Sequence, residues 1–271
     1  MTTAGDSHDV REALASWLAY LRDIGVRDLR VSGAVHLRPL PEVASVGAGT
    51  RPVSRRAPAM ASDPALTAGD LFRTAGDPAH QRSDPMERLR QIRSELGECE
   101  RCKLCRGRRN IVFGVGSPRA RMMFVGEGPG ADEDAQGEPF VGRAGQKLTE
   151  MIKAIGLGRE QVYIANVVKC RPPENRKPES DEVATCSPFL FAQIDAIRPK
   201  VIVVLGASAA EALLGTRMGI TRLRGRWGSF RGIPVMPTFH PSYLLRAYTS
   251  ENRRNVFEDL KAARQRMDEE P

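Results

Sequence analysis

The sequence predicts an α/β protein with a mostly parallel central sheet flanked by helices on both faces, preceded by a disordered N-terminal extension. From about residue 87 onward, short apolar runs alternate with segments of helical periodicity, as is typical of a parallel sheet covered by helices. The region 34–86 is instead rich in Ala, Pro, Ser, Arg and Gly and has no sustained periodicity. Such a composition buries too little apolar surface to offset the entropy lost on ordering.

These patterns divide the chain into three parts. Residues 1–33 contain an expected amphipathic helix over 8–25, which we interpret as a partner-docking or merely solvent-exposed element with no catalytic role. Its apolar residues recur at helical spacing: Val10, Leu14, Trp17, Leu18 and Leu21. Residues 34–86 are predicted to be a disordered linker, and residues 87–271 the folded domain.

The folded domain has alternating strand and helix signals. Short apolar runs predict buried strands at 122–125, 162–168, 201–205 and 235–238. Helices are predicted at 87–96, 143–155, 180–197, 207–214 and 251–266, with a break in the third near Pro188. In such sheets ligands bind at the carboxyl ends of the strands. The glycine turn after Val125, Asn166 and His240 all fall at that edge.

Composition restricts the class of protein and its partners. Among the 271 residues, no apolar run approaches the roughly 18 needed for a membrane span, and the N-terminus lacks the features of a secretory signal. We therefore expect a cytoplasmic protein that is kept reduced and has no membrane association. The net charge of +8 arises from residues 88–271. That surplus suits a polyanion such as nucleic acid, although charge alone is weak evidence.

Four cysteines suggest a metal or cluster site. Cys99 and Cys102 form a CxxC pair, and Cys170 and Cys186 follow at a distance. Both zinc and iron–sulfur clusters accept four cysteine ligands. Zinc sites usually have two closely spaced pairs, whereas fifteen residues separate Cys170 from Cys186, which favours [4Fe–4S]. Cys105 extends the first pair to CxxCxxC and is a further candidate ligand.

Three longer motifs are diagnostic. They are GEGPGADED from Gly126 with GEPFVGRAGQ from Gly137, NVVKCRPPENR from Asn166, and HPSYLLR from His240. In this order, over about residues 88–265, they resemble the family 4 uracil-DNA glycosylases. The GEGPG turn matches neither the dinucleotide fingerprint nor a phosphate-binding loop with lysine.

The resemblance implies a uracil-DNA glycosylase-like fold and a monofunctional glycosylase. Such an enzyme hydrolyses the N-glycosidic bond of a flipped-out deoxyuridine in DNA and so starts base excision repair. It also implies a structural [4Fe–4S] cluster held by Cys99, Cys102, Cys170 and Cys186, with Cys105 spare. We expect a monomer whose N-terminal segment binds a repair or replication protein. The stretch 173–180 contains no histidine, which favours a turnover enzyme over a covalent DNA trap.

Candidate roles follow from the chemistry of base release. Phe140 could stack on the pyrimidine face, as its family counterpart does. Asn166 has a donor and an acceptor that match the edge of uracil and not that of cytosine. His240 is expected to donate a hydrogen bond to uracil O2 as negative charge develops there. Gly128 and Asn175 are also assigned to substrate binding.

Two carboxylates are candidates for orienting the water that attacks the sugar. The resemblance indicates Glu127, with Glu133 nearby, and either could orient the water or stabilise a cationic sugar. Leu244, Leu245 and Arg246 could wedge into the space left by a flipped base, or the two leucines could pack in the core. The remaining DNA contacts are expected from two basic clusters, Arg101, Lys103, Arg106, Arg108 and Arg109, and Arg222, Arg224 and Arg226. The alternative function is a non-catalytic iron–sulfur DNA-binding module or adaptor.

Overall fold

The computed structural model describes residues 84–269. The predicted helix at 8–25 and nearly all of the predicted linker 34–86 lie outside the described residues, so both stay predictions. The first described helix, α2 (Pro85–Leu96), begins two residues before its predicted start, with proline in the first turn. Proline suits that position because its missing N–H would have no partner inside the helix.

A six-stranded sheet forms the centre of the described region, with the strand order β1-β3-β2-β4-β6-β5. Its parallel strands are β2 (Met122–Gly126), β3 (Tyr163–Asn166), β4 (Val201–Leu205) and β6 (Ile233–Thr238). The short edge strands β1 (Val115–Gly116) and β5 (Gly228–Phe230) pair antiparallel. The predicted mostly parallel α/β fold is thus confirmed. The two edge strands were not predicted, because two or three residues carry no measurable alternation.

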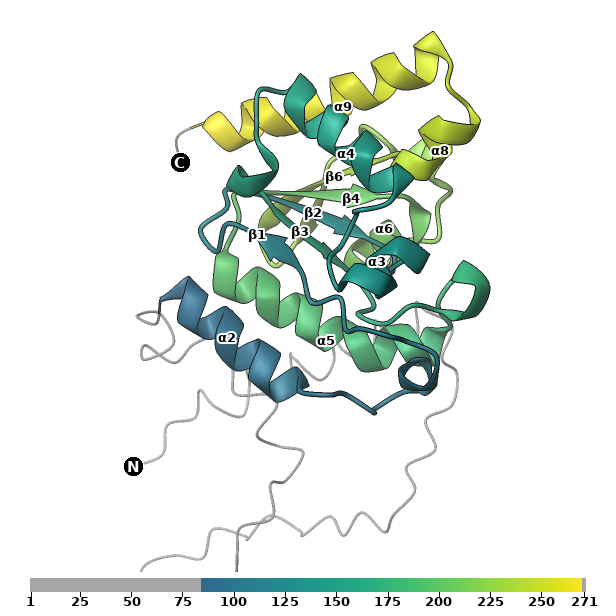
Figure 1. Ribbon diagram of the computed structural model, residues 1–271. Coiled ribbons are helices and arrows are strands. Elements are labelled where there is room, and N and C mark those ends of the chain that lie inside the picture. Colours follow the sequence, from purple (N-terminus) through teal and green to yellow (C-terminus); the bar gives the residue numbers. More distant parts are fainter. Residues whose placement is uncertain (1–83, 270–271) are drawn as a thin grey trace, which may run out of the picture. The chain divides into compact units, whose positions relative to one another are not determined.

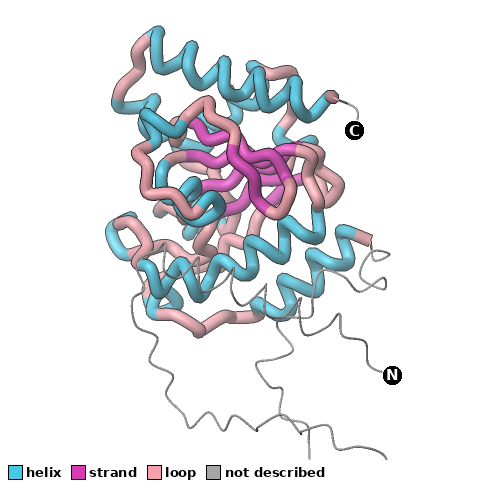
Figure 2. Tube along the Cα trace, turned by 180° about the vertical axis from the view of Figure 1, so that it is seen from behind, coloured by secondary structure: helices cyan, strands magenta, loops and turns pink. Residues whose placement is uncertain are grey.

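Helices cover both faces of the sheet (Figure 1; seen from behind in Figure 2). Besides α2 they are α3 (Ala131–Gln136), α4 (Arg143–Ala154), α5 (Ser180–Ile197), α6 (Ala207–Leu214), α7 (Ile220–Leu223), α8 (Pro241–Arg246) and α9 (Ser250–Asp268). Single 3₁₀ turns occur at Lys103–Arg106, Arg159–Gln161 and Pro173–Asn175. The short helices α3, α7 and α8 were not predicted, since about one turn shows no period. None of the helices in 84–269 is long and apolar enough to cross a membrane.

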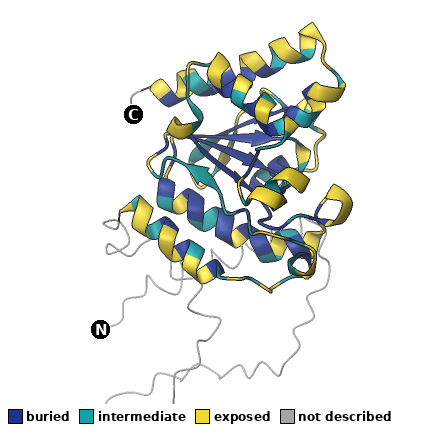
Figure 3. Ribbon diagram, in the orientation of Figure 1, coloured by how far each residue is buried: buried dark blue, intermediate teal, exposed yellow. Residues whose placement is uncertain are grey.

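Two apolar layers stabilise the sheet, one on each face. Met123, Val125 and Ile202 face α2, α5 and α6, whereas Phe124 and Val203 face α4, α8 and α9. Successive side chains of a strand point to opposite faces, so strands buried on both sides read as continuous apolar runs. Figure 3 shows the central strands β2, β3 and β4 buried throughout and the helices exposed on their outer sides.

The predicted break of the long helix at Pro188 is wrong. Helix α5 continues through Pro188 to Ile197. Proline removes the bond from its own nitrogen to the carbonyl four residues earlier, here that of Ala184. Both residues lie on the exposed face of α5, so water can satisfy that carbonyl.

Candidate active site

A cavity of about 390 Å³ opens at the carboxyl ends of β2, β3 and β6. It brings together residues from all three diagnostic motifs, which lie far apart in the chain. The lining residues are Gly128, Pro129, Gly130, Glu133, Phe140, Ala144, Asn166, Pro172, Asn175, Arg176, His240, Ser242 and Arg246. Six of the seven residues predicted for catalysis or substrate binding are therefore at one site.

Asn166 is the last residue of β3 and is almost fully buried. Its side-chain Oδ1 is the one buried side-chain polar atom of the described region without a hydrogen-bond partner. Burying an acceptor without a partner costs about 1–3 kcal/mol. An orphan acceptor at the wall of a cavity indicates that a ligand donates to it.

Phe140 lies beside this amide in a strained backbone conformation. Its φ is +55°, which is uncommon for a bulky residue and accumulates at functional sites. The absence of a side chain at Gly126 lets Asn166 and Phe140 lie side by side. A Cβ there would be 2.4 Å from Asn166 Oδ1 and 2.5 Å from Phe140 Cζ. Gly145 likewise leaves room for the Phe140 carbonyl.

The Glu133 carboxylate holds the loop that carries Phe140. One oxygen accepts hydrogen bonds from the backbone N–H groups of Val141 and Gly142, both at 3.0 Å, and the other from Gly130 at 3.0 Å. Arg159 supports the same loop by donating to the Pro139 carbonyl. Glu133 thus lines the cavity with both oxygens engaged, a geometry that suits positioning of the loop.

Glu127 is the predicted site residue that does not line the cavity. It is half-buried directly before the lining residue Gly128, and its carboxylate makes no hydrogen bond or ion pair in the described part of the chain. Its backbone carbonyl accepts from Val168 N at 3.1 Å, which places it where the chain leaves β2.

His240 precedes α8 and forms its N-cap. Its Nδ1 accepts from Ser242 N at 3.1 Å and lies 2.8 Å from Ser242 Oγ, so the ring proton resides on Nε2. Burial, together with the positive charge of Arg246, lowers the pKa of His240 to about 4. The ring is therefore neutral near pH 7 and presents one donor, the Nε2–H.

The rest of the lining adds a closely packed glycine, an amide and positive charge. Gly128 lies close to Val168, since a Cβ at residue 128 would be 2.8 Å from Val168 Cγ2. Asn175 accepts from Arg171 Nε at 2.8 Å and adopts φ +55°. Arg176 and Arg246 were not predicted as lining residues. Arg176 directly follows Asn175, and Arg246 is the last residue of the third motif. Both basic side chains could have been inferred from these positions in the sequence.

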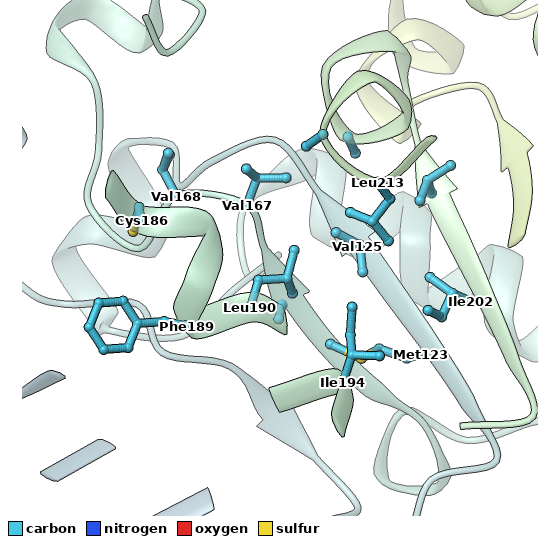
Figure 4. Packing of buried hydrophobic residues seen from close by; sticks show 14 of the residues in the cluster. Met123, Val125, Val167, Val168, Cys186, Phe189, Leu190, Ile194, Ile202 and Leu213 are labelled. Atoms are coloured by element: carbon cyan, nitrogen blue, oxygen red, sulfur yellow. The ribbon is translucent and has the colours of Figure 1, made fainter. Parts of the chain in front are cut away.

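The four predicted cysteine ligands gather beside this cavity. Cys170 and Cys186 are buried in the layer under the sheet, and Cys99 and Cys102 pack against its edge. Figure 4 shows Cys186 beside Val168, on the side of the layer away from Ile202. Burial raises the pKa of the Cys102, Cys170 and Cys186 thiols, that of Cys186 to about 12, and neighbouring cysteines reinforce each increase.

Hydrogen-bond donors surround these sulfurs. Arg101 Nη1 lies 3.2 Å from Cys99 Sγ, Arg108 Nη1 lies 3.4 Å from Cys170 Sγ, and Lys169 N lies 3.2 Å from Cys186 Sγ. Such donors stabilise thiolates, which are the ligating form of cysteine. Within residues 84–269 no three Cys, His, Asp or Glu side chains are arranged to hold one metal ion. Four cysteine sulfurs with such donors have the chemistry that a cysteine-ligated cluster requires.

Comparisons with known proteins agree with these observations. Residues 113–261 match the model of the uracil DNA glycosylase superfamily. The chain is 51% identical over 183 residues to a type-4 uracil-DNA glycosylase of Thermotoga maritima, covering 66% of this chain and 94% of that protein. The chain belongs to the type-4 uracil-DNA glycosylase family. The Archaeoglobus fulgidus type-4 protein is 45% identical over 65% of this chain and 92% of its own length. A type-5 protein of Pyrobaculum aerophilum is 34% identical, covering 48% and 64% respectively.

In this type-4 family member, several basic side chains expected to bind DNA make contacts within the protein itself. Arg101 and Arg108 contact the cysteine site, as described above. Arg224 pairs with the buried Asp259 and donates to the Asn255 carbonyl at 2.7 Å. The sequence of a basic cluster does not show which of its side chains form hydrogen bonds or ion pairs within the protein.

The two leucines after His240 take different places. Leu244 is buried in the layer with α9, which is the core alternative considered for it. Leu245 is 37% exposed and directly precedes Arg246, which lines the cavity. Of the two leucines, only Leu245 is therefore available to act as a wedge, together with the exposed Arg246.

Proposed function

We propose that the chain is a monofunctional uracil-DNA glycosylase that hydrolyses the N-glycosidic bond of a flipped-out deoxyuridine and so starts base excision repair. Membership of the type-4 family supports the class of enzyme. The orphan Asn166 Oδ1 at the cavity wall carries the substrate assignment, because uracil N3–H is a donor that would satisfy it.

The cavity supports a specific pose for the base. Uracil stacks on Phe140, its N3–H donates to Asn166 Oδ1, and its O4 accepts from the Asn166 amide nitrogen. Cytosine has an acceptor at N3 and an amino group at C4, so it would leave the buried amide unpaired on both atoms. Such mismatches in a hydrogen-bonding site can reduce the specificity constant by about 10⁴-fold.

Bond cleavage places negative charge on the base and positive charge on the sugar. As the C1′–N1 bond breaks, its electron pair moves into the uracil ring, and His240 Nε2–H donates to O2. A donor placed where charge develops is worth about 10²–10³ in rate. Water then adds to C1′ and loses a proton. In this scheme Glu133 holds the loop that carries Phe140. The Glu127 carboxylate, which has no hydrogen-bond partner in the described part of the chain, guides the water.

The cysteine site is proposed to hold a [4Fe–4S] cluster through Cys99, Cys102, Cys170 and Cys186. Bound there, the cluster supplies covalent cross-links between these segments and no step of the reaction. Pro172, Asn175 and Arg176 lie between Cys170 and Cys186 and line the cavity. Anchoring both ends of that loop would order one wall of the uracil pocket.

We further propose that the protein acts as a monomer and that its N-terminal segment binds a repair or replication protein.

The deciding experiment is base release from an end-labelled oligonucleotide with one uracil, followed by alkali cleavage. Iron-loaded wild-type protein is compared with Asn166→Ala and His240→Ala, and a thymine oligonucleotide is the control. Scission by wild type, strongly reduced in both variants, supports the proposal. DNA binding without scission by wild-type protein would favour the non-catalytic binding module.

A further inference from the structure

A buried lysine connects the cysteine site to the proposed uracil-binding residue. Lys169 lies three residues after Asn166 and directly before Cys170, and none of its surface is exposed. Its Nζ donates to the backbone carbonyl of Asn166 at 2.9 Å and to Gln193 Oε1 at 2.6 Å. Its own backbone N–H donates to Cys186 Sγ at 3.2 Å.

Two hydrogen bonds and one aromatic ring surround this ammonium. The centroid of the Phe113 ring lies 6.0 Å from Nζ. Gln193 is held in turn, because its Nε2 donates to the Phe113 carbonyl at 3.0 Å and to Tyr163 Oη at 3.2 Å. A buried hydrogen-bond network favours one arrangement of its members. Gln193 is therefore oriented to present its carbonyl oxygen to Lys169.

The charge of this ammonium requires an explanation. Burying an ion costs several kcal/mol unless an opposite charge lies nearby, and within residues 84–269 the acceptors of Lys169 Nζ are the Asn166 carbonyl and Gln193 Oε1, with no carboxylate among them. The cysteine site lies next to it, since Cys186 Sγ accepts from the Lys169 backbone N–H. A cysteine-ligated cluster would supply the missing countercharge, which gives a reason for lysine at a position where an apolar residue would be cheaper to bury.

The contact with Asn166 has a functional consequence. Asn166 ends β3, and its peptide carbonyl is held where the chain leaves the strand. The orientation of that peptide affects the direction of the Asn166 side chain, whose amide faces the cavity. We propose that Lys169 is a positioning residue that couples the cysteine site to the uracil-recognising amide of Asn166. This inference rests on the proposed function.

Iron-loaded Lys169→Met tests the coupling, since methionine keeps an unbranched side chain of similar length and removes the charge and the donors. Lys261→Met, an exposed lysine of α9, is the matched control. The readouts are the single-turnover rate of uracil release, the affinity for the same oligonucleotide carrying an abasic site, and iron per protein. We expect the rate to fall about 10- to 100-fold with normal abasic-site affinity and iron content.

The other outcomes overturn the inference. An unchanged rate would show that Asn166 does not need Lys169. A rate that falls only in proportion to iron, or together with abasic-site affinity, would assign Lys169 a merely structural role. If Lys169→Met does not fold, Lys169→Arg applies the same criteria, because arginine keeps the charge and displaces the donors. Failure of wild-type protein to release uracil would instead refute the proposed function.

Discussion

The ring of Phe140 lies 5.7 Å from the ring of His240, centroid to centroid, with the two planes inclined by 35°. Phe140 comes from the loop before α4 and His240 from the start of α8, and these two helices pack together. A pyrimidine stacked on Phe140 would therefore have one edge within reach of His240. The stacking surface and the hydrogen-bond donor depend on the same helix contact.

Gly126→Ala should block the cavity and leave the fold intact. The new methyl group would collide with Asn166 Oδ1 and Phe140 Cζ, and displacing either disturbs the stacked base. We expect about a 10²-fold loss of uracil release. Gly219→Ala is the control, since a Cβ there meets nothing within 4 Å. Equal activity of both variants would contradict the assigned pocket.

Asn166→Ala should abolish discrimination by the pocket without destabilising the free protein. Wild type already bears the cost of the orphan Oδ1, so we expect the melting temperature to stay the same or rise by about 2–4 °C per kcal/mol gained. Asn110→Ala should lower it, because Asn110 Nδ2 donates to the Asp134 carbonyl at 2.8 Å. Thermal unfolding of both variants measures this, and a large loss for Asn166→Ala would refute the idea of a strained, ligand-ready amide.

His240 should titrate far below an ordinary histidine. Its pKa is lowered to about 4 in the folded protein, so the rate of uracil release should show no histidine limb between pH 6 and 8. Between pH 4 and 6.5 the unfolded chain binds more protons at this position. Its contribution to stability is thus complete above pH 6.5 and is lost as the pH falls toward 4. His240→Gln should flatten that dependence in melting experiments; a rate limb near 6.5 would contradict the assignment.

Glu182→Ala should loosen the wall that contains Arg176. Glu182 is fully buried, and Arg176 donates to its two oxygens at 2.7 and 2.8 Å, which holds the pKa of this carboxyl below its usual range. We expect a loss of about 2–3 kcal/mol in the free energy of unfolding and weaker DNA binding.

Glu211→Ala provides the comparison for that variant. Its pair with Lys177 is largely exposed, so we expect a change of about 0–1 kcal/mol. Denaturant unfolding of the iron-loaded proteins distinguishes the two. Similar values for both would mean that burial of Glu182 does not strengthen its ion pair.

The fold class, the four parallel strands and six of the residues that line the cavity could be predicted from the sequence. Continuous apolar runs predicted the four parallel strands because both faces of that sheet are buried. Asn166 and His240 could then be placed at one edge, since carboxyl ends of parallel strands meet there. Phe140, Gly128 and Asn175 followed from the resemblance of the motifs and line the same cavity.

The contacts of individual polar side chains could not be predicted from the sequence and became known only from the folded structure. It showed that three backbone amides engage Glu133, that Glu127 does not line the cavity, and that Arg108 faces a cysteine. It also placed the Lys169 ammonium against Asn166. Loop side chains have no period, and their partners come from segments distant in the chain. Their roles therefore arise when the packed core brings those segments together.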